Sequence, residues 1–194
     1  MKKTLFLMFG LVMTLCTTAQ VKVGLKGGAS FANVKYTSGT SSETFNTIIA
    51  PNFGITLDFP GKSAFNIQSG LFYTGMGGKS SVGSFTETVN LNYLSIPVLA
   101  KLSIGSGFFG YFGPQLSFLI SAKSKDPNGT YDIKKDVNST GLFGILGLGY
   151  NLSEKFNFFG QYSAGFSNLS KSSNSGDKLN ANAFTIGFGL SLSK

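Results

Sequence analysis

The sequence has no histidine, no tryptophan and no arginine, and only one cysteine among its 194 residues. Without histidine the chain cannot form the Ser-His or Asp-His pair that supplies the general base of many hydrolases. Lysine or a carboxylate could replace that base, but no spacing in the sequence points to one. We therefore expect no enzymatic activity, no catalytic residue and no cofactor.

The single cysteine, Cys16, lies in an N-terminal segment that we expect to be removed. This segment starts with two lysines after Met1, continues as an apolar run over residues 5–16 and ends in small residues. A positive start, a short apolar core and small residues before the cut are typical of a secretory signal. We predict a signal peptide over 1–19 and one mature domain over 20–194. That domain would have no cysteine for a disulfide or a thiolate metal site.

Charge is sparse and mainly positive. Charged residues make up 12% of the chain, and 16 lysines outnumber 8 acidic residues. Because the chain is exported, we do not expect nucleic acid as a partner of this basic chain, whereas lysines at strand ends suit an anionic membrane surface or simply solubility. The 26 glycines and 20 phenylalanines do not fit an ordinary soluble domain. No run after the signal is long enough for a membrane helix, so a β-barrel remains.

A pattern of period two between Ile49 and Tyr73 predicts the first pair of strands. Apolar residues alternate with small or polar ones over 49–59, and the alternation resumes over 65–73 after a Pro-Gly turn at 60–63. Each strand would have about ten residues, which is the length that a tilted membrane strand needs.

The remaining chain continues this pattern and predicts an eight-stranded antiparallel up-and-down transmembrane β-barrel, all-β in class. Long polar connections alternate with short turns, as in bacterial outer-membrane barrels, which places both chain ends in the periplasm. The first strand should pair with the last, because an open edge in lipid is costly. Strands are expected at 21–35, 49–59, 65–74, 86–102, 108–120, 142–150, 156–167 and 184–193, with long connections at 36–47, 75–85, 122–138 and 168–178.

The alternation changes phase within the strand expected at 86–102. Its apolar residues are odd-numbered up to Tyr93 and even-numbered from Leu94 onward. A β-bulge between Tyr93 and Pro97 would explain this change, since a bulge adds one residue to one strand and proline lacks an N–H.

The composition of the second strand face separates two kinds of barrel. That face holds Gly, Ser, Asn, Gln and Thr, whereas the outside of a soluble barrel would carry many charges. A narrow membrane-barrel lumen needs such small and amide side chains. We therefore expect the apolar face to contact lipid and keep a soluble, lipocalin-like ligand-binding barrel as the alternative. The residues expected outward are Phe53, Ile55, Leu57, Leu71, Phe158, Tyr162 and Phe188, with Phe59, Phe65, Tyr150 and Phe156 in a periplasmic girdle; Asn52, Gln68, Gln161 and Ser163 should point inward.

Two motifs have a structural interpretation beside a functional one. Residues 105–110 match the G-x-G-x-x-G of dinucleotide sites, but they precede a strand of aromatics, so we expect a hairpin turn. Asp126, Asp132 and Asp136 share one connection and carry oxygen ligands for a hard cation. Four lysines lie in the same connection and the spacing matches no known motif, so we expect a solvated loop and no metal site.

Lys22, Lys26 and Asp58 fall on the predicted lumen face near the periplasmic end. Because an unpaired buried charge is costly, we expect an ion pair that plugs the lumen. The alternative, an ion path, is weaker because side chains mostly fill the interior of an eight-stranded barrel.

Three segments carry a resemblance to a known family. Residues 23–28 (VGLKGG), 91–99 (LNYLSIPVL) and 112–117 (FGPQLS) resemble the small outer-membrane β-barrel proteins called PorT-like, and the Tyr-Leu-x-Ile-Pro element is the most specific part. The resemblance spans the mature chain and implies a barrel in the cell outer membrane. The family takes its name from a member tied to protein secretion and gliding, so a secretion accessory is a second alternative.

The functional expectation is a monomer embedded in outer-membrane lipid. Its outward-facing loops would have a structural, adhesive or partner-binding role toward surface or envelope proteins. Nucleic acid is not an expected partner.

Overall fold

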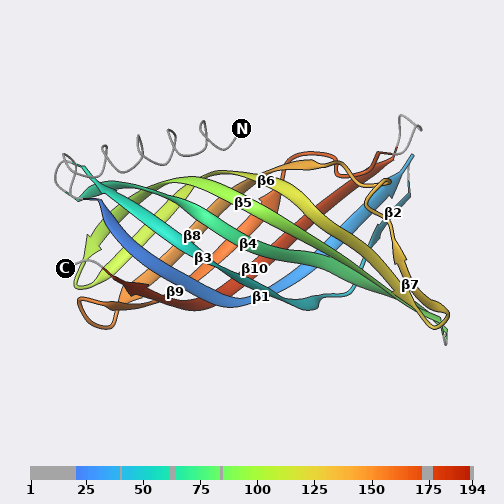
Figure 1. Cartoon of the computed structure of the whole chain (residues 1–194), viewed down its shortest axis with the longest axis horizontal. Coiled ribbons are helices and arrows are strands. Elements are labelled where there is room, and N and C mark those ends of the chain that lie inside the picture. Colours follow the sequence, from blue (N-terminus) through green and yellow to red (C-terminus); the bar gives the residue numbers. More distant parts are fainter. Residues whose placement is uncertain (1–20, 40, 62–63, 84, 172–176, 193–194) are drawn as a thin grey trace, which may run out of the picture.

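The computed structural model describes residues 21–39, 41–61, 64–83, 85–171 and 177–192 of the chain (Figure 1). The predicted signal peptide at 1–19 lies outside the described residues. The regular elements of the described part are strands, and all their pairings are antiparallel. Within that part no helix has the length and apolarity to cross a membrane.

Eight long strands form a closed ring, with strongly tilted strands around one lumen (Figure 1). They are β1 (Lys22–Ser38), β3 (Ile48–Pro60), β4 (Phe65–Val82), β5 (Phe85–Gly105), β6 (Phe108–Asp126), β8 (Thr140–Asn151), β9 (Phe156–Gly165) and β10 (Lys178–Ser191). Two short strands, β2 (Ser41–Thr44) and β7 (Gly129–Asp132), pair with the ends of β1 and β6.

The first and last long strands close the ring, as predicted. β1 pairs with β10 without interruption from Gly24 opposite Ser191 to Thr37 opposite Lys178. This ladder satisfies backbone groups that would each cost several kcal/mol if they faced lipid unpaired. The predicted eight-stranded antiparallel fold is therefore confirmed.

Two of the predicted long loops are largely strand, which corrects the expected boundaries. The connection expected at 75–85 continues the β4–β5 ladder up to Val82 opposite Phe85, and much of 122–138 belongs to β6 and β7. Polar side chains support these extensions: Ser124 donates a 2.6 Å hydrogen bond to Glu87, and the Ser81 and Thr86 hydroxyls lie 3.1 Å apart. The sequence shows no apolar alternation there because polar side chains face out of these extensions.

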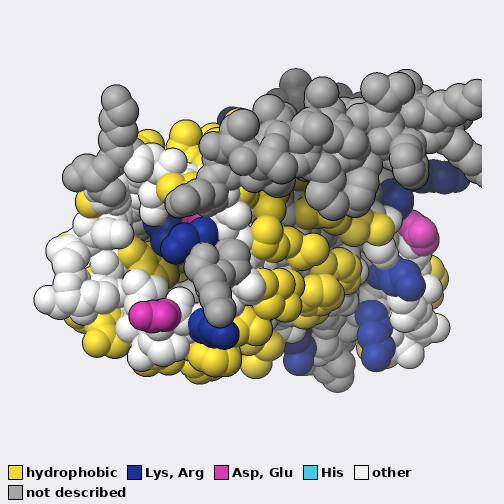
Figure 2. All heavy atoms as spheres, turned by 60° about the vertical axis from the view of Figure 1, so that its left-hand side comes forward, with side chains coloured by type: hydrophobic (Ala, Val, Ile, Leu, Met, Phe, Trp, Pro, Cys, Tyr) yellow, Lys and Arg dark blue, Asp and Glu magenta, His cyan; other side chains and the backbone are white. Residues whose placement is uncertain are grey.

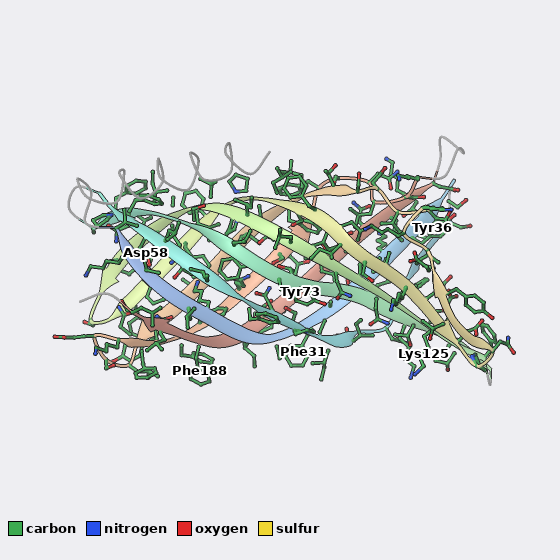
Figure 3. The ribbon with its side chains drawn as sticks, in the orientation of Figure 1. Phe31, Tyr36, Asp58, Tyr73, Lys125 and Phe188 are labelled. Atoms are coloured by element: carbon green, nitrogen blue, oxygen red, sulfur yellow. The ribbon has the colours of Figure 1, made fainter. Side chains whose placement is uncertain are left out.

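The predicted directions of side chains are confirmed at nearly every position. Phe53, Ile55 and Phe188 are about half exposed on the outer surface, and Phe31 and Phe188 project away from the ring (Figure 3). Asn52, Gln68 and Ser163 are buried toward the lumen. Leu57 and Gln161 are only partly exposed, but both have the predicted direction: Leu57 has the same parity as the outward Ile55, and Gln161 lines the space in the lumen beside Lys26.

Hydrophobic side chains cover the outside of the ring as a broad band, with charged side chains on either side of it (Figure 2). The four aromatics expected to form a girdle are all exposed beside the short turns: Phe59, Phe65, Tyr150 and Phe156. Tyr150 packs against Phe108 with ring centroids 4.7 Å apart, so aromatic rings contact each other at this end of the band.

The phase change in β5 has a different cause from the predicted bulge. Odd-numbered residues of β5 point inward along Leu91–Leu99, so the direction of the side chains does not change. What changes is the polarity of the outward residues. Toward the start of β5 they are apolar from Leu102 to Leu94, and the next outward residues, Asn92, Asn90 and Thr88, are polar. The other strands that extend in the same direction show the same inversion, with Asn33 opposite Asn182 on β1 and β10. The hydrophobic band therefore ends at this level.

A bulge does lie beside Tyr93, but the extra residue belongs to β6. Asn92 pairs with Ser121 and Tyr93 pairs with Leu119, which leaves Ile120 without a partner on β5. The carbonyl of Ile120 instead accepts a 2.8 Å hydrogen bond from the Lys134 ammonium. Pro97 interrupts the other side of β5, where its carbonyl accepts a hydrogen bond from the Ser69 hydroxyl.

Inward aromatic rings lie opposite glycines of the neighbouring strand. Tyr111 pairs with Gly147 and Phe109 pairs with Gly149, and a Cβ at either glycine would overlap the ring. The same arrangement joins Phe72 to Gly54. The narrow lumen therefore accommodates large rings only because glycines face them.

We predict that Gly187→Ala destabilises the barrel by about 1 to 3 kcal/mol, the usual cost of overpacking. A Cβ at Gly187 would overlap the backbone of Gly27 and Gly28 on β1, which cannot rotate away as a side chain can. Denaturant unfolding in lipid vesicles would measure the free energy. Gly160→Ala is the control, because its Cβ would lie 3.6 Å from the nearest atom of Phe184. Equal stability of the two variants would contradict the prediction.

Candidate functional site

The barrel has two chemically different ends. The short-turn end carries the connections after β3, β5 and β8, together with the start of β1 and the end of β10. The long-loop end carries β2, β7 and the extended β4–β5 hairpin (Figure 1). Between them the lumen has three levels, which we call the short-turn cavity, the polar layer and the apolar cap.

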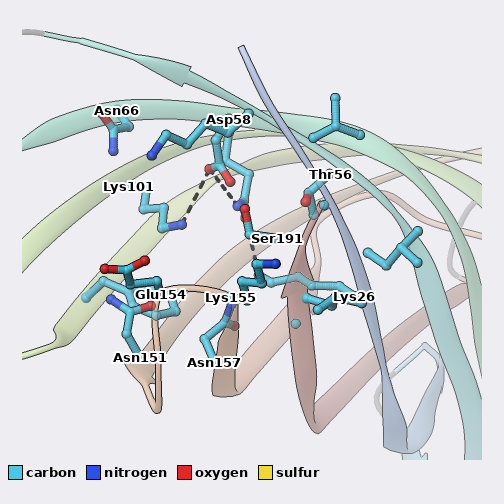
Figure 4. A pocket seen from close by; sticks show the side chains of 18 of the residues that line it. Lys26, Thr56, Asp58, Asn66, Lys101, Asn151, Glu154, Lys155, Asn157 and Ser191 are labelled. Atoms are coloured by element: carbon cyan, nitrogen blue, oxygen red, sulfur yellow. Dashed lines mark hydrogen bonds and ion pairs between the residues drawn. The ribbon is translucent and has the colours of Figure 1, made fainter. Parts of the chain in front are cut away.

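The short-turn cavity has a volume of about 590 Å³ and opens at the end of the barrel (Figure 4). Four lysines and two acidic residues line it, together with several amides and hydroxyls. The charged residues are Lys22, Lys26, Lys101, Lys155, Asp58 and Glu154. The cavity therefore has two more positive than negative side chains.

A chain of polar contacts joins the charged residues at the floor of this cavity. The Lys26 ammonium donates a 3.2 Å hydrogen bond to Gln68 Oε1, and Gln68 Nε2 donates a 2.8 Å hydrogen bond to Asp58. Asp58 also forms an ion pair with Lys101 at 3.5 Å (Figure 4). The predicted lumen ion pair is thus present, but Lys101 makes it, and Lys26 reaches Asp58 only through Gln68.

Two aromatic rings hold the buried Lys26 ammonium. Its Nζ lies 4.2 Å from the centroid of the Tyr111 ring and 4.5 Å from that of Phe159. Cation–π contacts of this kind favour the charged group by about 0.5 to 2 kcal/mol each. They offset part of the cost of burying Lys26, which is 8% exposed.

Neither Lys101 nor Tyr111 was singled out from the sequence, although the alternation of the strand at 156–167 does place Phe159 on the polar face. The signal for Lys101 was its parity, because it is odd-numbered in β5 whereas the outward apolar residues Val98 and Leu102 are even-numbered. Tyr111 was harder to place, because an aromatic on a strand of a membrane barrel normally faces lipid. Its glycine partner on β8, Gly147, was the available signal.

The polar layer fills the middle of the lumen. Its hydroxyls and amides bond one another, as the Ser30–Thr185 contact at 2.7 Å and the Ser95–Ser117 contact at 2.8 Å show. The space left beside Lys26 and Gln115 is about 10 Å³, which is room for roughly one water molecule.

The apolar cap closes the long-loop end. Its buried side chains come from six of the long strands and from two loops: Ala32, Val34, Met76, Leu91, Tyr93, Leu119, Ala122, Val137, Phe143, Leu169, Ala181 and Ala183. Leu169 is fully buried and Val137 is 3% exposed, although both lie outside the long strands. The two loops therefore fold into the mouth of the barrel.

Backbone and amide hydrogen bonds hold these two loops together. The N–H of Asn138 donates to the carbonyl of Leu169 at 2.7 Å, and the Asn138 side chain donates to the carbonyls of Asn168 and Ser170. The N–H of Leu169 donates in turn to the carbonyl of Leu179 on β10. These bonds position Val137 and Leu169 over the lumen.

The family comparison identifies this architecture. A family described as outer membrane protein beta-barrel domain matches residues 17–171 of the chain. The chain belongs to this family. The outer-membrane barrel lies in the cell outer membrane, and its apolar band contacts lipid, so the soluble lipocalin-like alternative is wrong.

Solved structures of outer-membrane barrels are similar to the chain at low identity. Neisserial surface protein A (NspA) is 14% identical, with a TM-score of 0.58 over 87% of this chain and 96% of that chain. The attachment invasion locus protein Ail of Yersinia pestis is 12% identical, with a TM-score of 0.48 over 88% and 97%. OprG of Pseudomonas aeruginosa is 13% identical, with a TM-score of 0.43 over 89% and 96%. No curated protein matches the chain.

The other motifs of this outer-membrane barrel have local structural roles. Residues 105–107 form the predicted tight turn, with positive φ at all three positions. Asp126 accepts hydrogen bonds from the N–H groups of Asn128 and Gly129, and Asp132 accepts one from that of Lys134. No group of three or more metal-binding His, Cys, Asp or Glu side chains lies within the described residues.

We predict that Asp58→Asn destabilises the barrel by about 1 to 3 kcal/mol, since it removes the charged partner of Lys101 and Gln68. The temperature at which the folded band disappears from detergent gels would fall, and denaturant unfolding would give the free energy. Glu154→Gln is the matched control, because Glu154 lines the same cavity but is exposed. A loss of stability as large in the control as in Asp58→Asn would contradict a specific role for Asp58.

Proposed function

We propose that this outer-membrane barrel is a closed scaffold that presents a binding surface to the outside of the cell at its long-loop end. The observation that carries the proposal is that two features occur together at this end of the barrel. The apolar cap closes the lumen there, while β4, β5 and β6 continue past the hydrophobic band. A closed lumen does not suit a pore, and the added sheet offers a platform.

The length of the strands supports this interpretation. A tilted strand needs about 9 to 11 residues to cross a bilayer, whereas β5 has 21 and β6 has 19. On β5 the apolar outward residues end at Leu94, which leaves residues 85–93 beyond the band. The protein extends its sheet further than membrane anchoring requires.

The surface of this extension has the features of a contact site. Phe85 at the β4–β5 tip is 47% exposed and Tyr131 on β7 is 51% exposed. Exposed lysines lie near them, including Lys125 at the end of β6 (Figure 3). Aromatic side chains within a polar surround are enriched in protein interfaces, so a protein partner fits this surface better than a small solute does.

The narrower PorT-like assignment, and with it a secretion role, remains a prediction. Its most specific element, Tyr93 to Pro97, alternates between the lumen and the outer face of β5. Tyr93 packs in the apolar cap against Phe143, and the Pro97 carbonyl accepts a hydrogen bond from Ser69. The element therefore has a packing role that needs no secretion partner. The signal peptide at 1–19 and a monomeric state also remain predictions.

The proposed orientation predicts which loops react from outside the cell. In a Cys16→Ser background, Asn128→Cys at the long-loop end should react with an impermeant maleimide on intact cells. Glu154→Cys at the short-turn end should react only after the outer membrane is permeabilised. Labelling of Glu154→Cys alone on intact cells would show that the barrel has the opposite orientation.

Photo-crosslinking in living cells tests the binding surface itself. We expect p-benzoylphenylalanine placed at Phe85 or at Tyr131 to give discrete protein adducts of higher mass. The same probe at Phe158, which faces the lipid band, is the control and should give none of these adducts. The proposal would be overturned if the crosslinked adducts were identical at all three positions and the purified barrel showed steady conductance in planar bilayers, since the first result contradicts a specific surface and the second a closed lumen.

A further inference from the structure

We propose that the short-turn cavity binds a small anion that carries carboxylate or phosphate oxygens and at least one hydroxyl group. This site is separate from the surface proposed at the long-loop end, because the polar layer lies between them. Nothing in the fold of the barrel requires an open, positively charged cavity of about 590 Å³.

The charge on the cavity wall is unbalanced at its most buried point. Asp58 is the acidic residue on the floor, and it already pairs with Lys101 at 3.5 Å and accepts the Gln68 amide. Lys26 contacts no carboxylate within the described part of the chain; it donates to the neutral Gln68 oxygen. A cation that is 8% exposed is normally paired, so an anionic ligand would complete its surroundings.

The aromatic rings leave that ammonium available to a ligand. Tyr111 and Phe159 contact Lys26 through their faces and hold it in place without neutralising its charge. The Tyr111 hydroxyl is used elsewhere, since it donates to Gln161 at 3.1 Å. Lys26 is therefore fixed in position at the floor of the cavity, beside the Asp58–Lys101 pair (Figure 4).

A second observation points to the hydroxyl group of the ligand. Asn157 lines the cavity, and its side-chain oxygen is buried without a hydrogen-bond partner in the described structure. Buried acceptors of this kind usually have a donor, and an O–H of the ligand would supply one. Lys22 and Lys155 lie in the same lining, so a second acidic group of the ligand could also be bound.

The geometry indicates a site with one entrance. The cavity opens at the short-turn end, and above Lys26 the free space falls to about 10 Å³. A small anion can therefore enter and leave by the same route but cannot cross the barrel.

Calorimetric titration of the full barrel in a zwitterionic detergent tests the proposal. The probes are L-malate and glycerol 3-phosphate, each compared with potassium chloride of equal ionic strength. We expect saturable binding of at least one probe, and the tighter one assigns the ligand to carboxylates or to phosphates. Binding should weaken by about tenfold or more in Lys26→Met, whose thioether can still pack between the two rings. Lys125→Met, at the opposite end, should bind as the wild type does.

Two results would overturn the proposal: no saturable binding of either probe, or equal binding by wild type and Lys26→Met. A second measurement does not depend on the folding of that variant. In a Cys16→Ser background, Ser103→Cys at the cavity wall should react faster with an anionic methanethiosulfonate than with a cationic one, after correction for their intrinsic rates. The probe that binds more tightly in the titration should slow the reaction of Ser103→Cys with the anionic reagent. Equal corrected rates, unaffected by either probe, would also exclude the site.

Discussion

The closed backbone ladder is the constraint on which the other features of this barrel depend. Lipid offers no hydrogen bonds to an open edge, so β1 must pair with β10 along its whole membrane-spanning length, and it does. Closure with only eight long strands leaves a narrow lumen. That lumen explains the glycines opposite Phe72, Phe109 and Tyr111, because no larger residue could face those rings. It also explains why a single lysine, Lys26, can occupy the lumen between two rings and still bond to Gln68.

A second constraint is the change of solvent along each strand. Within the hydrophobic band the outward face is apolar and the lumen is polar, whereas beyond Leu94 the outward face of β5 carries Asn92 and Asn90 and the inside carries Leu91 and Tyr93. Lipid surrounds the first part and water surrounds the second, so each part places its apolar side chains differently. The apolar cap is thus the hydrophobic core of a small water-exposed structure that continues the membrane barrel without a break.

Sequence alternation predicted the strands, their closure and the direction of most side chains, because a period of two directly reports which face a residue occupies. It misassigned the extensions at 75–85 and 122–138, where polar side chains replace the apolar outward face. It also interpreted the inversion at Tyr93 as a bulge of β5, since a phase change looks the same whether the strand shifts or the solvent changes. At the candidate site it placed Lys26 and Asp58 correctly near one end of the lumen. It could not pair them through Gln68 or identify Lys101, because register between strands distant in sequence decides those contacts.

The filled middle of the lumen separates the chemistry of the two ends. The Ser30–Thr185 and Ser95–Ser117 hydrogen bonds join directly paired residues of neighbouring strands, β1 with β10 and β5 with β6, so these hydroxyls bond to one another on the wall of the lumen between the two ends. A ligand in the short-turn cavity can therefore influence the long-loop end only through the strands themselves. β1 is one such connection, because it carries Lys26 in the cavity and both Ala32 and Val34 in the apolar cap. Since its ladder to β10 is continuous between these residues, a shift of Lys26 would be resisted by every pair along it. The structure thus favours two independent sites on one rigid wall over a transmembrane signal.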